Sequence, residues 1–139
     1  MVRKAARRRA PVARRGELRV RPSPKKRASS AARNAAARLK FERLARRWRR
    51  DTAVLSSTID IAMHPSYQAI IGMGEIAVPL ILGSLSRRIE HWFWALEAIT
   101  QDNPVPRRSR GDIEAMARAW LIWGHERGLV TLDAKAAAA

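Results

Sequence analysis

Residues 90–100 read EHWFWALEAIT and place three large aromatic side chains in succession. A helix turns by about 100° per residue, so Trp92 and Leu96 share one face and Phe93 lies about 100° away. These three side chains fit within the wide apolar stripe of a buried helix. Trp94 lies about 200° from Trp92 and has to point in another direction. We therefore expect a buried helix over residues 89–100, with the environment of Trp94 as the open question.

Two interpretations of Trp94 are open. In a compact bundle a central helix is covered on several sides, and Trp94 then belongs to the core, which is the usual role of an aromatic stripe. In a more open arrangement it is exposed, and exposed Trp is enriched at protein-binding hot spots. The residues that we name as candidate contacts for a partner protein are Trp94, Trp92 and His91. Four of the five tryptophans lie between residues 92 and 123, which predicts that the last two helices pack on each other through their indole rings.

Toward the C-terminus, the next segment ends one helix and precedes another. The sequence QDNPVPRR at residues 101–108 contains two prolines and an Asn-Pro turn signal, so it closes the aromatic helix. A last helix is predicted to begin at Gly111 or Asp112. From there apolar residues recur at spacings of three and four residues, at Ile113, Met116, Trp120 and Trp123. Gly128 is the expected C-cap, and the Leu-Val pair after it is expected to fold back as a hydrophobic contact.

Toward the N-terminus, two helices are predicted immediately before the aromatic segment. Residues 75–88, EIAVPLILGSLSRR, form one of them, with a proline close enough to its start to kink it. The stretch HPSYQAIIGMG at residues 64–74 forms the other, with Pro65 in its first turn. Its glycines end the helix, and Gly72 or Gly74 is expected to take the left-handed conformation of a C-cap.

Two more helices precede these. A short one is predicted over residues 54–63, ended by the following His-Pro. A long one is predicted from near residue 31 to residue 50, with Ser29 or Ser30 as its N-cap. Its apolar side chains recur at roughly helical spacing, at Leu39, Phe41, Leu44, Ala45 and Trp48. Because no segment alternates with period two for long enough to indicate a strand, we predict an all-α fold, a compact helical bundle.

Charge is distributed unevenly along the 139 residues. Residues 1–50 hold 20 Lys or Arg and 2 acids, whereas residues 51–139 hold 8 Lys or Arg and 10 acids, for a net charge of +16. Residues 1–30 are rich in Arg, Ala and Pro, and their mutual repulsion and small apolar surface predict a disordered basic arm. We therefore expect this arm, then a helical domain over residues 31–130 and a frayed tail over residues 131–139.

The basic arm is the clearest chemical signal in the sequence. Each cation that neutralises a phosphate releases a condensed counterion, so the arm predicts non-specific, salt-sensitive binding to DNA or RNA. A solubilising tail has the same composition, and an alternative nucleic-acid surface is the arginine-rich helix face over residues 38–50. The candidate nucleic-acid contacts are Arg7, Arg8, Arg9, Arg14, Arg15, Lys25, Lys26, Arg27, Arg43, Arg46, Arg47 and Arg50.

Residues that carry catalysis or bind metals are sparse. His64, His91 and His125 stand far apart, without the spacing of a metal-binding motif. The GMGE sequence at residues 72–75 is better explained as a helix end than as a phosphate loop, because its glutamate repels an anion. We expect no metal site, no cofactor and no enzymatic activity. An enzyme whose catalytic groups come together only in the fold is the third hypothesis.

Cysteine usage and hydropathy bear on the compartment. The chain has no cysteine, which fits a reducing cytoplasm. No apolar region follows the N-terminal charges, as it does in a signal peptide. The longest apolar run is interrupted by Glu75 and Pro79 and falls short of the ~20 residues that a spanning helix needs. We therefore expect a cytoplasmic protein that has no membrane partner.

A block of motifs lies between residues 41 and 129: LSS at 55–57, HPSYQAIIGMG at 64–74, AVPLIL at 77–82, HWFWALEAIT at 91–100, NPVP at 103–106 and AWLIWG at 119–124. This block resembles a family of small uncharacterised bacterial helical proteins. The resemblance covers about two thirds of the chain and implies a helical domain without an established activity. Residues 73–100 are also similar to a single HEAT repeat, which implies a helical hairpin of the kind that binds proteins.

From these patterns, the leading hypothesis is a non-enzymatic helical module that binds another protein, with the basic arm adding non-specific affinity for nucleic acid. Such a protein would be an accessory or regulatory component of a small bacterial system. The alternative is a nucleic-acid-binding regulator that uses the arginine face of residues 38–50.

Overall fold

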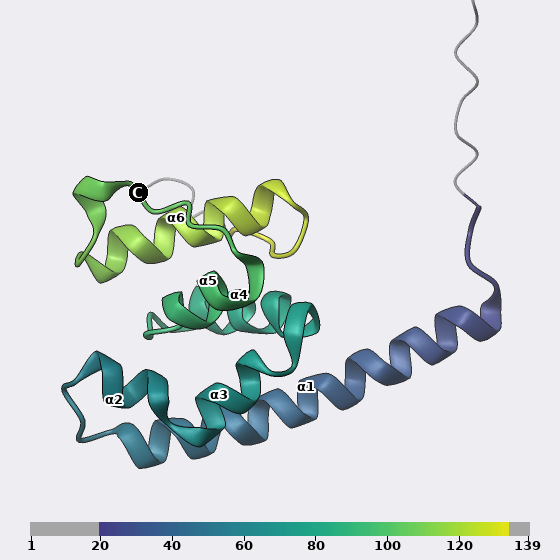
Figure 1. The fold of residues 1–139 in the computed structure, drawn as a ribbon. Helices are drawn as coiled ribbons and strands as arrows, with labels where there is room; N and C mark the ends of the chain where they lie inside the picture. Colours follow the sequence, from purple (N-terminus) through teal and green to yellow (C-terminus); the bar gives the residue numbers. More distant parts are fainter. Residues whose placement is uncertain (1–19, 134–139) are drawn as a thin grey trace, which may run out of the picture.

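The computed structural model of the chain describes residues 20–133, and within this range the backbone forms helices and connecting segments without a β-strand. This part of the chain is therefore all-α, as predicted. The elements are α1 (Pro24–Thr52), α2 (Thr58–Met63), α3 (Pro65–Ile71), the 3₁₀ helix η1 (Gly74–Ala77), α4 (Val78–Arg87), α5 (Phe93–Thr100), the 3₁₀ helix η2 (Arg107–Ser109) and α6 (Ile113–Glu126). Figure 1 shows three layers, with α1, α2 and α3 in the first, α4 and α5 in the second and α6 in the third.

Helix α1 begins at Pro24, earlier than the predicted start near residue 31. The hydroxyl of Ser23 accepts a hydrogen bond from the backbone N–H three residues later at 3.4 Å, and the fixed φ of Pro24 suits a first helical turn. The predicted caps Ser29 and Ser30 lie inside the helix, so that prediction was wrong. The last part of the predicted disordered arm is helical, because this stronger capping signal lies upstream of those serines.

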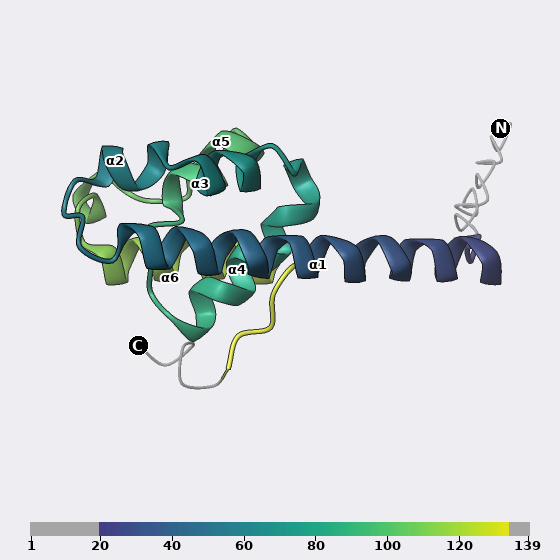
Figure 2. The same cartoon turned by 90° about the horizontal axis from the view of Figure 1, so that it is seen from below.

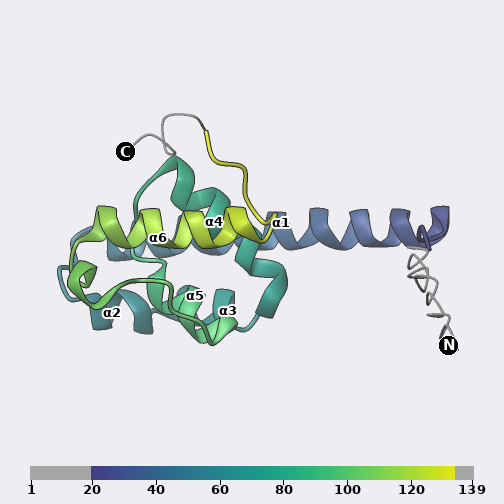
Figure 3. The same cartoon turned by 90° about the horizontal axis from the view of Figure 1, so that it is seen from above.

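The N-terminal half of α1 extends beyond the other helices (Figures 2 and 3). Residues 1–19 and 134–139 lie outside the described range. The disorder predicted for residues 1–19 therefore concerns a part of the chain that lies outside the described residues. The same holds for five candidate nucleic-acid contacts, Arg7, Arg8, Arg9, Arg14 and Arg15.

Local capping also sets the ends of α2 and α3. Helix α2 starts later than the predicted residue 54, because the Ser57 hydroxyl accepts a hydrogen bond from the backbone N–H of Asp60 at 3.3 Å. It ends before His-Pro, as predicted. After α3, Gly72 keeps a right-handed conformation with φ −63°, and it is Gly74, with φ +72°, that takes the left-handed one.

The two helices predicted over residues 75–88 and 89–100 are both shorter in the structure. Pro79 lies in the first turn of α4, and η1 precedes that helix as a separate turn. Helix α5 begins only at Phe93, so Trp92 occupies its N-cap position rather than its interior. Gln101 ends α5 in a left-handed conformation with φ 56°.

The ends of α6 follow the sequence prediction. A side-chain oxygen of Asp112 accepts hydrogen bonds from the N–H groups of the second and third helical residues at 3.1 and 3.0 Å. At the other end Gly128 has φ +68°, its N–H donates to the His125 carbonyl, and the Leu129 N–H donates to the Gly124 carbonyl. Leu129 then packs against the core with the valine after it, which confirms the predicted fold-back.

Four aromatic side chains form the centre of the core: Phe41 and Trp48 from α1, Tyr67 from α3, and Trp92 from the segment before α5. Trp92 is fully buried, and its ring centroid lies 4.4 Å from that of Trp48 and 5.6 Å from that of Phe41. The Tyr67 ring stacks on it at 5.5 Å with an interplanar angle of 8°. These contacts join the first layer to the second.

This packing corrects the prediction that the last two helices are joined through indole rings. Trp92 packs against α1 and α3, whereas Trp120 and Trp123 pack on each other within α6 at 5.2 Å. Trp94 is 50% exposed, so its placement in the core is wrong and the exposed interpretation is correct. The pattern of aromatic residues predicted the burial of Trp92 and Phe93, but neither the exposure of Trp94 nor which rings pack together.

The Tyr67 hydroxyl ties α3 to the start of α5. It donates a hydrogen bond to the His91 carbonyl at 2.8 Å and accepts one from the Ala95 N–H at 3.0 Å. Burial raises the pKa of the Tyr67 hydroxyl above its ordinary value, and the smaller opposing effect of the Ala95 N–H does not offset it. The group therefore stays protonated and keeps its donor role at neutral pH.

Gly124 of α6 allows a close approach to α4. A Cβ at this position would stand 2.5 Å from Leu82 Cδ1 and 3.1 Å from Val130 Cγ1, and the Leu82 side chain is fully buried with little room to move. We expect Gly124→Ala to lower the free energy of unfolding by ~1–3 kcal/mol through overpacking. Urea denaturation followed by circular dichroism measures this change.

The matched control is Gly83→Ala in α4, where the nearest atom to a new Cβ is Arg87 Nη1, 3.8 Å away. Alanine there should raise the free energy of unfolding by up to ~1 kcal/mol through its helix propensity. If both substitutions stabilise the protein equally, the close contact between α4 and α6 does not exist in solution.

Candidate nucleic-acid interface

Helix α1 has two chemically different faces. Its C-terminal half packs Phe41, Ala45 and Trp48 against the body, a term that we use for residues 53–133. The opposite face carries four exposed arginines, which we call the outward arginines: Arg43, Arg46, Arg47 and Arg50. Their spacing of three and four residues places them side by side on one face of the helix. The structure therefore brings these four sequence-predicted candidates together on one exposed surface.

One arginine of this half of α1 points toward the body. Arg49 donates two hydrogen bonds to the Glu90 carboxylate, at 2.6 Å from Nε to Oε1 and 2.7 Å from Nη2 to Oε2, and a third to Ser84 Oγ at 2.8 Å. The indole Nε1–H of Trp92 donates to the same carboxylate at 3.2 Å. The Glu90 side chain is only 12% exposed. Arg49 is thus neutralised and holds α1 in place.

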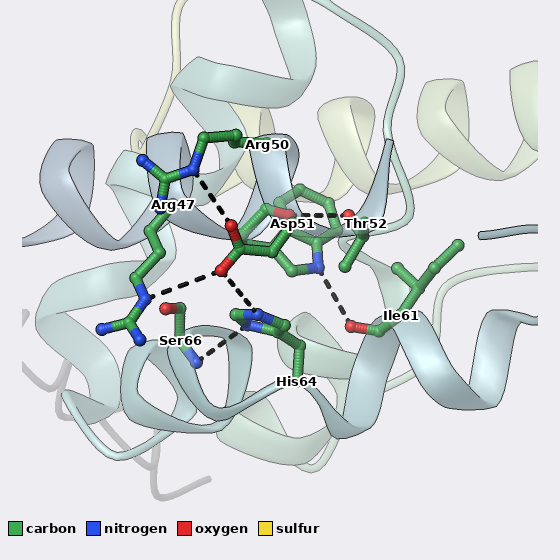
Figure 4. Close-up of polar contacts among 8 residues, drawn as sticks. Arg47, Arg50, Asp51, Thr52, Ile61, His64 and Ser66 are labelled. Atoms are coloured by element: carbon green, nitrogen blue, oxygen red, sulfur yellow. Dashed lines mark hydrogen bonds and ion pairs between the residues drawn. The ribbon is translucent and has the colours of Figure 1, made fainter. Parts of the chain in front are cut away.

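Asp51 faces the last two outward arginines (Figure 4). Its Oδ1 lies 3.0 Å from Arg50 Nε, and its Oδ2 lies 3.6 Å from Arg47 Nε and 3.2 Å from His64 Nε2. Desolvation raises the pKa of the Asp51 carboxyl, but the hydrogen bonds and charges of Arg50 and His64 together hold it below its ordinary value of 3.8. The charged carboxylate offsets part of the positive charge at this end of α1.

Both ring nitrogens of His64 are engaged. Its Nδ1 accepts a hydrogen bond from the Ser66 backbone N–H at 3.1 Å and so caps α3, which places the ring proton on Nε2, facing Asp51 (Figure 4). Ser66 contributes its backbone rather than its hydroxyl to this contact. The three residues are therefore not arranged as a nucleophilic triad, in which a hydroxyl faces the imidazole. They connect α1 to α3.

The other two histidines lie apart from His64 in the fold. The His91 ring packs edge-on to Phe93 at 6.4 Å, and His125 Nδ1 lies 3.4 Å from the Val130 carbonyl oxygen. Among residues 20–133, no group of three or more His, Cys, Asp or Glu side chains lies close enough to hold a metal ion. The three histidines of the described chain are therefore not brought together into one cluster.

The N-terminal half of α1 carries further cations. The first acidic residue along α1 is Glu42, so more than half of the helix has no carboxylate of its own. Its basic residues up to that point are all exposed, at Lys25, Lys26, Arg27, Arg33, Arg38 and Lys40. Together with the outward arginines they distribute positive charge along the whole length of the helix.

The three candidate contacts for a partner protein do not form one surface. Trp92 is fully buried in the core, so its prediction as a partner contact was wrong. His91 is exposed beside a groove between the end of α1 and the linker that precedes α5. Trp94 lines a different groove of about 610 Å³ on α5, together with Glu97 and Met116.

Comparison of the chain with protein-family models, with curated proteins and with solved structures found no match. The resemblance to a bacterial family and to a HEAT repeat therefore stays a prediction.

Within residues 20–133, no single helix is both long enough and apolar enough to cross a membrane. The stretches Pro65–Ile71 and Gly74–Arg87 reach the required length and composition only as a pair, and a bend of 111° separates them.

The ion pairs of Asp51 predict a pH-dependent contribution to stability. Its folded-state pKa is depressed, so the carboxylate stabilises the fold at pH values above its ordinary, unfolded-state pKa of 3.8, and this contribution is lost as the pH falls through the lower folded-state pKa. We expect Asp51→Asn to destabilise the protein at neutral pH and to lose this effect in acid. Urea denaturation at a series of pH values between 7 and 2 measures the difference.

Glu126→Gln serves as the control, because it removes an exposed carboxylate that has no ion pair with any described residue. It should leave the pH dependence of the unfolding free energy close to that of the unmodified chain. A destabilisation by Asp51→Asn that is equal at all pH values would mean that Asp51 acts through packing rather than charge.

Proposed function

We propose that this chain is a non-enzymatic helical interaction protein that binds nucleic acid through α1. The observation that supports this function best is the composition and exposure of that helix, which holds eleven Lys and Arg residues and two acids. Of these cations, Arg49 alone is held by a carboxylate of the body within the described range. Arg47 and Arg50 share the single carboxylate of Asp51, and the remaining basic side chains of the helix are exposed to solvent, where they can meet a polyanion.

The dimensions of α1 suit a nucleic-acid backbone. Its 29 residues give a rod of about 43 Å at 1.5 Å per residue. Duplex DNA carries about one phosphate charge per 1.7 Å of axis, so cations along the rod meet phosphates over its full length. Binding of this kind gains free energy from counterion release, falls steeply with salt and has little dependence on base sequence. The basic residues of the arm add to it by the same mechanism.

The docking of α1 on the body supports this function by fixing the outward arginines in direction. The buried Trp48 side chain and the Arg49–Glu90 pair hold the C-terminal half of α1 against the body. The backbone that carries the outward arginines therefore loses no conformational freedom when a nucleic acid binds. A preorganised surface of this kind has a smaller entropic cost of association than a flexible arm.

The outward arginines provide the test of this function. Replacing all four with glutamine keeps helix propensity while removing four charges. We expect affinity for a mixed-sequence DNA duplex to fall at least tenfold, and the slope of log K against log salt to decrease by about 3–4, since each lost phosphate contact removes about 0.9. Fluorescence anisotropy at several salt concentrations measures both quantities.

The control removes the same number of exposed arginines elsewhere, at Arg87, Arg107, Arg108 and Arg110. This variant has the same net charge as the first, so a purely global charge effect would lower both affinities equally. Equal losses in the two variants would overturn the assignment of α1 as the interface.

Protein binding is a second candidate function, favoured by the exposure of Trp94. Large aromatic side chains that project from a folded surface beside a groove are typical anchors of protein interfaces. Trp94 is half exposed beside a groove on α5 whose carboxylates, Glu97 and Asp102, favour a basic partner. This surface lies on a different helix from the outward arginines, so both functions are compatible.

We expect Trp94→Ala to abolish the binding of those partner proteins that remain bound to the unmodified chain after nuclease treatment and at high salt. The control is Ile122→Ala, because Ile122 has the same exposed fraction of 50% and lies on α6, outside this groove. Affinity capture with the purified full chain measures the loss. The amount of each captured partner is compared among the unmodified chain, the Trp94→Ala variant and the Ile122→Ala variant. If the partners captured by the Trp94→Ala protein equal those of the control, this surface is not a protein-binding site.

A further inference from the structure

We infer that the projecting segment of α1, residues 24–33, seats in the major groove of double-stranded B-form DNA. The inference rests on the proposed function, since it takes α1 as the nucleic-acid-binding element. It goes further by assigning the class of nucleic acid and the part of the helix that enters it. Four properties of the segment carry it: its exposure, its charge pattern, its orientation and its lack of aromatic residues.

The projecting segment is exposed around nearly all of its circumference. Of its residues only Ser30 is half-buried, and the two views at right angles to Figure 1 show the segment extending past the body. A helix that lacks tertiary packing is marginally stable in water, because most helical stability in proteins comes from a packed face. A ligand that surrounds the segment can therefore supply contacts that the described chain does not.

The cations of this region lie on both sides of a strip that lacks charge. In a projection down the helix axis, Lys25 and Arg27 are about 200° apart. Lys26 and Arg33 lie within this wider arc between the two residues. The other arc holds only small side chains, at Ala28, Ala31 and Ala32. A helix of this cross-section turns its small side chains toward base edges while cations on both flanks reach the phosphates of the two strands.

The uncharged strip faces the same way as the outward arginines. Ala28, Ala32, Ala35, Leu39 and Arg43 follow one another at spacings of four, three, four and four residues, which keeps them on one side of a helix. That side is opposite the buried Phe41, Ala45 and Trp48. A duplex on this face therefore meets both the projecting segment and the outward arginines, and the body does not obstruct it.

Groove dimensions distinguish the classes of nucleic acid. The major groove of B-form DNA is about 12 Å wide and admits an α-helix. The major groove of A-form RNA is deep and narrow and excludes one. Single strands are held largely by stacking of bases on aromatic side chains, and residues 20–40 contain none. Double-stranded DNA is thus the ligand that fits both the shape and the composition of the segment.

The first arm of the test compares three ligands of one sequence with the full chain: a DNA duplex, the RNA duplex and the single DNA strand. We expect the DNA duplex to bind at least tenfold more tightly than either of the others at the same salt concentration. Fluorescence anisotropy with labelled oligonucleotides measures the three affinities. Equal affinities for the DNA and RNA duplexes would overturn the inference.

The second arm places a bulky side chain on the strip or away from it. Ala28→Phe puts a ring on the strip, whereas Ser30→Phe puts the same ring about 200° around the helix, on the side turned away from the duplex. We expect Ala28→Phe to weaken binding to the DNA duplex at least tenfold and Ser30→Phe to weaken it less than threefold. Circular dichroism confirms that both variants keep their helix content.

The outcomes separate this inference from the proposed function. If the outward arginines are needed for binding but the two phenylalanine variants bind DNA equally well, α1 contacts the backbone without entering the groove, and only the inference fails. If Ala28→Phe leaves DNA binding intact and changes the sedimentation coefficient instead, the strip pairs with a second copy of the chain. That result also overturns the inference.

Discussion

The burial of Trp92 between α1 and α3 is the contact on which the rest of the structure depends. Its ring meets three aromatic side chains, and its Nε1–H donates to the Glu90 carboxylate that also holds Arg49. Apolar contacts alone are non-directional and leave a helix free to rotate or slide. A bidentate arginine–carboxylate pair has a fixed geometry. The two together set both the depth and the rotation of α1, and hence the direction in which its other arginines point.

Helix α1 thus uses arginine for two purposes, and the direction in which each side chain points decides which purpose it serves. Arg49 lies at the edge of the buried face, where its planar fork matches a carboxylate, while Arg46 and Arg50 on either side of it point into solvent. Arg49 and Arg50 are adjacent in the sequence, so a rotation of α1 by one residue, about 100°, would bring Arg50 to the place of Arg49. The specificity of the core packing is therefore what keeps an interface available on the outside.

Helical periodicity and capping chemistry were sufficient to predict the elements but not their partners. Asp112 and Gly128 marked both ends of α6 because caps depend on neighbouring residues alone. The start of α1 was missed because Ser23-Pro24 stood within a stretch whose composition indicated disorder. Arg49 was recognisable as lying four residues from the buried Ala45, but its pairing with Glu90 joins residues 41 positions apart, and no local pattern carries that information. For the same reason the burial of Trp92 was predictable and its contact with Trp48 was not.

Because of this tertiary structure, the positive charge of α1 is partly neutralised at its C-terminal end and not at its N-terminal end. At the C-terminal end, Glu90 neutralises Arg49, and Asp51 offsets Arg47 and Arg50. Toward the N-terminus no described carboxylate pairs with the basic residues, and the positive end of the helix dipole adds to their potential. A polyanion approaching α1 is therefore attracted most strongly to the end that extends furthest from the body. The segment with the fewest intramolecular contacts is also the one with the greatest electrostatic attraction for a phosphate backbone, because the two carboxylates that pair with arginines of α1, Asp51 and Glu90, both lie at the other end of the helix.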